Sequence, residues 1–183
     1  MTMRKGIYVV PTDRWYIERT VWLIAGVVLL ASALLAVLVN PLWIFGVIAT
    51  GLVSINVAFT GFCPIGNVLK LIGFKAALGE PNTKFYFLQT DSWYLERRIY
   101  VTVGVNIILG SILFLTVGPW WALFPAFVGA AMVWFAATGL CILANVLFWI
   151  GAEPRLNPGI LTSHRGKEVA ISPARVSADE KHA

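Results

Sequence analysis

The fold is decided by a long uncharged stretch near the start of the chain. Residues 21–39 read VWLIAGVVLLASALLAVLV, residues 42–59 read LWIFGVIATGLVSINVAF, and Asn40 and Pro41 stand between them. No Asp, Glu, Lys or Arg occurs between Arg19 and Lys70. About 20 apolar residues in a helix cross the hydrocarbon core of a bilayer, and proline breaks a helix because it has no N–H to donate. This stretch therefore predicts two membrane-spanning helices joined by a turn.

A second uncharged stretch, between Arg98 and Glu153, has the same form, with Gly118 and Pro119 at its centre. It predicts two further spans, over residues 99–117 and 120–137. The composition agrees, because only 13% of the 183 residues are charged, whereas a soluble domain has about 25%. We expect an all-α membrane protein with four transmembrane helices.

The basic residues indicate how the helices are oriented. All 14 Lys and Arg residues lie outside the four predicted spans and outside the two turns. Basic residues favour the cytoplasmic side of a membrane, so both termini and the central connection are expected to be cytoplasmic. The net charge of +5 is thus a topology signal, and the lipid bilayer rather than a nucleic acid is the expected partner.

The chain repeats itself. The segment Asp13-Arg-Trp-Tyr-Ile-Glu-Arg19 returns 78 residues later as Asp91-Ser-Trp-Tyr-Leu-Glu-Arg97, and the same offset pairs Cys63 with Cys141. We interpret this as a tandem duplication of a helical hairpin, with the two copies in parallel orientation about an axis along the membrane normal. The predicted divisions are an arm and first repeat (1–74), a cytoplasmic connector (75–92), a second repeat (93–151) and a polar cytoplasmic tail (152–183).

Each repeat ends in a corner that carries a cysteine. The first corner reads Thr60-Gly-Phe-Cys63-Pro64, and proline is favoured at the first position of a helix, so a short interfacial helix to about residue 74 is expected. A helix N-terminus lowers the pKa of a cysteine, which predicts a thiol that accepts sulfur or senses redox state. Cys141 precedes Ile142 in a more apolar segment, so its pKa should be raised. The alternative is that both cysteines are small residues packed where two helices meet.

Few other polar residues lie in or near the spans. Those that could line a path to the thiols are Asn56, Thr60, Asn106 and Thr138; the alternative is that they form hydrogen bonds between helices. A second group, Thr50, Ser54 and Ala58, recurs every fourth residue and predicts close helix packing.

The acidic residues beside the spans predict no catalytic site. Asp13, Glu18, Asp91 and Glu96 alternate with arginines, so we expect surface ion pairs. Both histidines, His164 and His182, fall in the tail. We therefore expect no metal, no cofactor and no enzymatic activity.

The sequence resembles a bacterial family of two-span membrane domains. The shared features are a basic segment, two spans, a Thr-Gly-Phe-Cys-Pro corner and a short apolar segment. The family's best-recognised type is YgaP, in which the spans follow a cytoplasmic rhodanese (sulfurtransferase) domain. The resemblance covers about residues 16–74 and 94–151, with Ile142 departing from the motif at the second corner. It implies a place in the inner (plasma) membrane and the handling of small sulfur species such as sulfide or thiocyanate.

Two functions remain open at this point. The first is a carrier or permease for small sulfur species that uses the Cys63 thiol. The second is a non-catalytic accessory or assembly subunit of a larger membrane complex. A homo-oligomer or other membrane subunits are the expected protein partners, because four spans are few for a conducting path.

Overall fold

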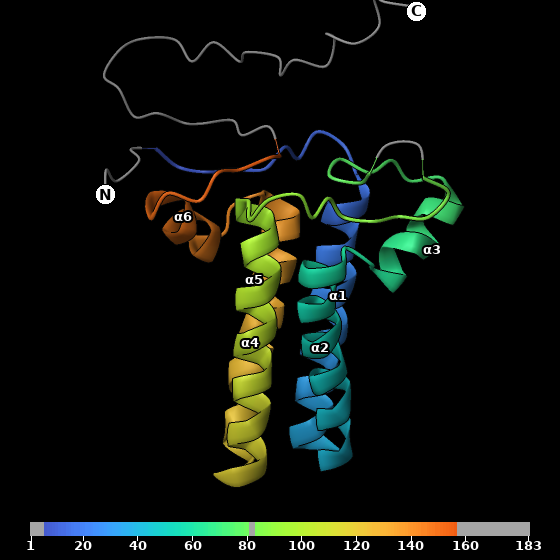
Figure 1. The fold of residues 1–183 in the computed structure, drawn as a ribbon. Coiled ribbons are helices and arrows are strands. Elements are labelled where there is room, and N and C mark those ends of the chain that lie inside the picture. The colour runs from blue at the N-terminus through green and yellow to red at the C-terminus, as the bar shows by residue number, and fades with distance from the viewer. Residues whose placement is uncertain (1–5, 81–82, 157–183) are drawn as a thin grey trace, which may run out of the picture.

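The described part of the chain, residues 6–80 and 83–156 of a computed structural model, is helical and contains no β-strand beyond isolated bridges. Its helices are α1 (Ile17–Leu38), α2 (Ile44–Thr60), α3 (Pro64–Ile72), α4 (Leu95–Thr116), α5 (Leu123–Thr138) and α6 (Ile142–Trp149) (Figure 1). Short 3-10 turns, Pro41–Trp43 and Pro119–Ala122, precede α2 and α5. From residue 157 onward, the predicted polar tail lies outside the described residues.

The expected all-α membrane fold is confirmed. Four helical segments are long and apolar enough to cross a membrane: Ile17–Leu38, Pro41–Thr60, Leu95–Thr116 and Pro119–Thr138. The first and third begin about one helical turn earlier than hydropathy alone predicts. Each of these extra turns contains a Glu-Arg pair whose side chains are buried inside the protein rather than facing lipid.

Glycines set the packing of the four long helices. The most closely packed pairs are α1 with α5 and α2 with α4. A Cβ atom on Gly26 would lie 2.9 Å from the carbonyl oxygen of Gly129, and one on Gly104 would lie 2.9 Å from that of Gly51. Small residues let helix backbones approach in a membrane, where dispersion contacts drive association. The tightest contacts therefore join the first half of the chain to the second.

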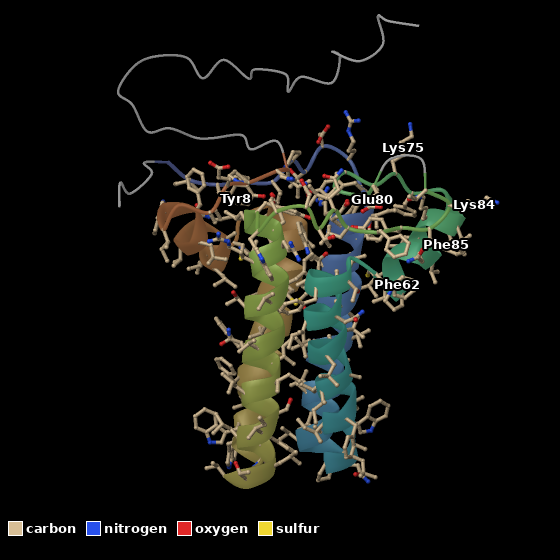
Figure 2. All side chains as sticks on the ribbon, viewed as in Figure 1. Tyr8, Phe62, Lys75, Glu80, Lys84 and Phe85 are labelled. Atoms are coloured by element: carbon tan, nitrogen blue, oxygen red, sulfur yellow. The ribbon has the colours of Figure 1, made fainter. Side chains whose placement is uncertain are left out.

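The short helices α3 and α6 lie on opposite sides of the same end of the bundle (Figure 1). Exposed charged side chains, including Lys75, Glu80 and Lys84, project from this end, which we call the polar end (Figure 2). The segments that precede α1 and α4 cross it. Val10 N–H donates to Gly139 O at 3.0 Å, and Leu88 N–H donates to Gly61 O at 2.8 Å.

Candidate functional site

The corner between α2 and α3 places Cys63. Helix α2 ends at Gly61, which has a left-handed backbone with φ of 74°, and α3 begins at Pro64. Cys63 caps α3, and its Sγ accepts a hydrogen bond from the Gly66 N–H at 3.3 Å. Proline at the first helical position loses no hydrogen bond. The sequence therefore placed the start of this helix correctly.

The predicted activation of the Cys63 thiol is wrong. Its side chain is only 2% exposed, and burial raises the pKa of the thiol even though the N–H groups of Gly66 and Ile65 lower it. Desolvation disfavours the thiolate more than the helix terminus favours it. The thiol is thus neutral at neutral pH.

Cys141 occupies the matching position at the start of α6 and is half-buried. Burial raises the pKa of its thiol, as predicted. Both cysteines are free, and the helices that they cap lie on opposite sides of the bundle (Figure 1). The structure therefore does not bring the two thiols together.

A cavity of about 310 Å³ adjoins Cys63. Residues of α1, α2 and α4 make up most of its lining, among them Val21, Trp22, Val57, Tyr100 and Ile107. None of the described residues that line it is charged. Pockets that hold small molecules begin at roughly this volume and are mostly apolar. We call this space the Cys63 cavity.

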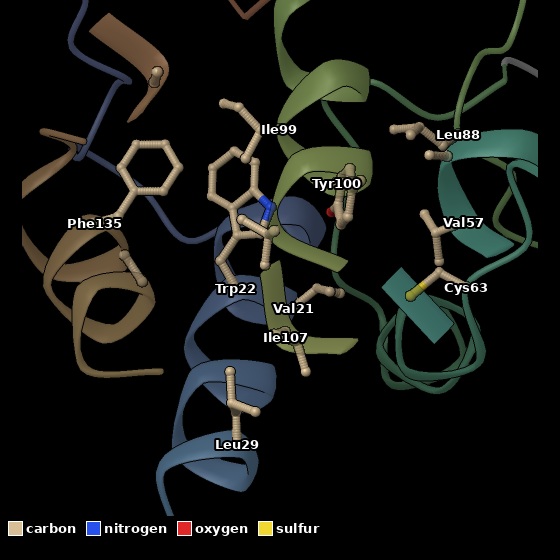
Figure 3. Packing of buried hydrophobic residues seen from close by; sticks show 14 of the residues in the cluster. Val21, Trp22, Leu29, Val57, Cys63, Leu88, Ile99, Tyr100, Ile107 and Phe135 are labelled. Carbon is tan, nitrogen blue, oxygen red and sulfur yellow. The ribbon is translucent and has the colours of Figure 1, made fainter. Parts of the chain in front are cut away.

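Figure 3 shows how these side chains lie. The Cys63 sulfur points away from the α2–α3 corner, toward Val21 and Ile107. The Trp22 indole lies between Phe135 and Tyr100, and its ring stacks on Phe135 with centroids 4.6 Å apart. The thiol and the indole therefore both line the cavity.

Two of the three residues predicted for helix packing contact α4. Ser54 Oγ donates to the carbonyl oxygen of Tyr100 at 2.9 Å, and the carbonyl oxygen of Ala58 accepts from Arg97 Nε at 2.6 Å. Thr50 instead bonds within its own helix and lines the Cys63 cavity. The same α2 face thus serves both the helix contact and the cavity wall.

The four residues considered for a polar path lie elsewhere. Thr60, Asn106 and Thr138 bond to carbonyl groups of their own helices, and Asn56 donates to Phe62 O at 3.4 Å. None of the four is among the residues that line the Cys63 cavity. The residues with hydroxyl groups that do line the cavity are Thr50, Ser54 and Tyr100.

One segment of the chain matches a family model. Residues 16–75 match the model of the transmembrane domain of YgaP-like inner membrane proteins. No curated protein and no solved structure matches the chain. The YgaP-like segment contains α1, α2, α3 and Cys63. The second copy inferred from the repeat lies outside this match and stays a prediction.

One carboxylate of the YgaP-like segment departs from the prediction. Glu18 is fully buried rather than part of a surface ion pair. Its oxygens accept hydrogen bonds from the N–H groups of Ala77 and Leu78, at 3.0 and 2.6 Å, and from the Tyr86 hydroxyl at 3.1 Å. Buried charges persist where several donors satisfy them. The carboxylate thereby fixes the connector that follows α3.

Glu96 forms a matching arrangement in the second half. It accepts from the Tyr8 hydroxyl at 2.7 Å, from Leu156 N–H at 2.9 Å and from Arg155 N–H. Burial raises the pKa of Tyr8, so its hydroxyl keeps the donated proton. Tyr8 and Tyr86 are 78 residues apart, a signal that the repeat extends upstream of Asp13. The predicted surface pairs hold only for Asp13 with Arg14 and for Asp91, which pairs with Arg155.

The arginines beside these carboxylates satisfy helix ends instead of pairing with acids. Arg19 Nε donates to Ala136 O at 2.7 Å near the end of α5, and Arg97 bonds in the same way to α2. The guanidinium group of Arg19 also lies 4.0 Å from the centroid of the Trp15 ring. Carbonyl groups in the last turn of a helix have no partner in the helix. The arginines therefore hold α1 against α5 and α4 against α2.

Proposed function

We propose that this membrane protein binds small, neutral sulfur species in the Cys63 cavity and passes them between the bilayer and the polar end. The observation that carries the proposal is the presence of the neutral Cys63 thiol in the lining of an uncharged cavity between candidate spans. The YgaP-like match supports the location, and the resemblance of the corner motif supports the sulfur chemistry. The role is binding and passage, without enzymatic turnover.

The lining favours one of the two ligands that the resemblance implies. Thiocyanate is an anion, and an anion in an apolar site without a cationic partner carries a large desolvation cost. Within residues 6–80 and 83–156, no Lys or Arg lines the cavity. Hydrogen sulfide in its neutral form meets no such cost, so it is the favoured ligand.

Sulfide uptake into proteoliposomes tests this proposal. Uptake should exceed that of protein-free vesicles, whereas thiocyanate uptake should not. Cys63→Ser should slow sulfide uptake, because serine still caps the helix but removes the thiol; Cys141→Ser is the matched control. Sulfide uptake equal to that of protein-free vesicles would refute passage, and uptake unchanged in Cys63→Ser would refute the role of the thiol.

A blocking variant gives a second test. At the repeat offset of 78 residues, Val57 of α2 corresponds to Phe135 of α5. Val57→Phe therefore puts into the cavity lining the residue that occurs at the matching position of α5. This variant should remove the uptake. Val27→Phe, on the lipid-facing side of α1 where Val27 is 51% exposed, is the control and should leave it intact.

We further propose that the polar end is cytoplasmic, since the basic residues lie beside the ends of the helices there. Reporter fusions at both termini should then be active only as cytoplasmic reporters. Only 28–44% of the most apolar part of each span is buried within the protein, so much helix surface is available to lipid or to another subunit. Purification in a mild detergent, followed by mass measurement of the intact particle, would distinguish a homo-oligomer from an assembly with other proteins.

A further inference from the structure

Three aromatic rings form a row that leads to the Cys63 cavity. The Trp22 indole stacks on Phe135 with ring centroids 4.6 Å apart, and the Tyr100 ring follows with its centroid 6.4 Å from that of the indole (Figure 3). Val57 comes next in this direction, and both Tyr100 and Val57 line the cavity. The row therefore has a ring at each of three positions, and an aliphatic side chain beside open space at the fourth.

The repeat offset shows what the fourth position lacks. At 78 residues, Trp22 corresponds to Tyr100, and Val57 corresponds to Phe135. The arginine three residues before each ring, Trp22 or Tyr100, donates to the carbonyl group that follows Phe135 or Val57, at 2.7 and 2.6 Å. The contact of α1 with α5 and that of α4 with α2 are thus held in the same way. The cavity lies where α2 carries a smaller side chain than α5 does.

The size and the lining of the cavity limit the ligand that could take this place. An apolar cavity of about 150 Å³ is enough to hold benzene, and the Cys63 cavity measures about 310 Å³. It therefore has room for one ring with a small substituent. The described residues around it are uncharged, so a charged molecule would lose its hydration there without compensation.

The exposed part of the lining indicates where such a ligand comes from. Val28 of α1 and Val53 of α2 line the cavity and are 45% and 36% exposed. Both lie near the middle of candidate membrane spans, so in a membrane they face the acyl chains of the lipid. A molecule that dissolves in the bilayer can reach the cavity from there.

We propose that the Cys63 cavity binds a small, neutral aromatic molecule whose ring packs against Tyr100 as the Phe135 ring packs against Trp22. A pair of aromatic rings is more stable than the burial of its apolar area alone accounts for, so Tyr100 favours an aromatic ring over a saturated ring of the same size. This goes beyond the proposed function, because the ring of Tyr100 rather than the Cys63 thiol selects the ligand.

A matched pair of probes tests the inference. Fluorobenzene is aromatic, fluorocyclohexane is a saturated ring of similar size, and fluorine NMR detects both. Their affinities are measured for the full chain in nanodiscs, with empty nanodiscs as the reference for partition into lipid. Fluorobenzene should bind about two- to tenfold more tightly than fluorocyclohexane, which corresponds to one contact between rings. Equal affinities, or no binding of fluorobenzene beyond its partition into lipid, would overturn the inference.

Variants at position 100 assign the preference to the ring of Tyr100. Tyr100→Phe keeps a ring and should keep the preference for fluorobenzene. Tyr100→Leu should abolish the preference while both probes still bind. A preference that survives in Tyr100→Leu would overturn the inference, since the selection would then come from another part of the cavity.

Val57→Phe supplies the missing ring from the chain itself. It should abolish the binding of both probes without lowering the midpoint of unfolding, whereas an added ring in a filled core lowers stability. Val27→Phe is the control and should leave binding unchanged. Fluorobenzene that binds Val57→Phe as tightly as the wild type would overturn the inference, and so would a marked fall in the midpoint of unfolding of Val57→Phe.

The thiol variant separates this inference from the proposed function. Cys63→Ser should slow sulfide uptake and should keep the preference for fluorobenzene. A failure of sulfide uptake in the wild type would leave the affinities of the two probes as an independent result.

Discussion

Glu18 and Glu96 are the residues whose burial is hardest to predict from the sequence. Each lies in the first turn of an apolar helix beside an arginine, which in most sequences marks a solvated ion pair, yet both are fully buried. Their partners are backbone N–H groups and tyrosine hydroxyls from segments about 60 to 90 residues away. In the sequence, only the 78-residue spacing of Tyr8 and Tyr86 points to this arrangement, because a single sequence does not show which distant segments meet.

Removal of one buried carboxylate tests its structural role. Glu18→Ala leaves the N–H groups of Ala77 and Leu78 and the hydroxyl of Tyr86 without acceptors. We expect the free energy of unfolding in mixed micelles to fall by roughly 3 kcal/mol, since each buried group left unsatisfied costs 1–3 kcal/mol. Asp13→Ala, at an exposed pair with Arg14, is the control and should leave the free energy of unfolding nearly unchanged, because exposed ion pairs contribute little to stability. Equal effects of the two variants would contradict the account.

The Cys63 thiol should react slowly at neutral pH. Burial raises its pKa, and only the thiolate is nucleophilic, so its alkylation rate should keep rising with pH beyond the ordinary thiol pKa of about 8.5. The measurement is the rate of iodoacetamide modification in Cys141→Ser between neutral and alkaline pH. A rate that levels off below the ordinary pKa would indicate an activated thiolate.

At the scale of elements, the glycine that ends α2 meets two separate structural requirements. Gly61 has a left-handed backbone, and a Cβ atom there would lie 2.4 Å from the carbonyl oxygen of Leu88. Gly73, which ends α3, is also left-handed, with φ of 103°, but a Cβ atom there would meet nothing within 4 Å. A comparison of Gly61 with Gly73 therefore distinguishes the need for a left-handed backbone from the need for space beside a second segment.

Alanine at these two positions should give unequal losses. Gly73→Ala should cost about 1 kcal/mol, the usual penalty of a left-handed conformation. Gly61→Ala should cost at least about 1 kcal/mol more, because the connector must also move. Both are measured as changes in the midpoint of unfolding in mixed micelles. Losses of the same size would show that the approach of Leu88 contributes nothing.

The segment before α1 is held by α6. Asn145 Oδ1 accepts from the Tyr8 N–H at 2.7 Å, and its Nδ2 donates to Tyr8 O at 3.1 Å. Asn67 of α3 binds Tyr86 in the same way. Asn145→Ala should therefore speed hydrogen exchange at residues 8–10 and spare residues 86–88, while Asn67→Ala should do the reverse. Exchange that accelerates at both segments in either variant would contradict this independent docking.

At the scale of the whole molecule, the four spans and their two turns could be predicted because hydropathy and proline placement are local properties. The close pairing of α1 with α5 and of α2 with α4 could not, since hydropathy does not specify which helices touch. The Cys63 cavity depends on the sizes of side chains from several helices, including Trp22, Val57 and Tyr100. The lowered Cys63 pKa was predicted wrongly for the same reason, because burial is a property of the assembled bundle.

We propose that reagents reach Cys63 through the uncharged cavity, and the modification of this thiol by two reagents tests this proposal most directly. In Cys141→Ser, neutral methyl methanethiosulfonate should modify Cys63 much faster than its cationic trimethylammonium-ethyl analogue. Val57→Phe should slow the neutral reagent by about tenfold or more, and Val27→Phe should not. Modification by both reagents at similar relative rates, or a rate unchanged by Val57→Phe, would contradict the claim.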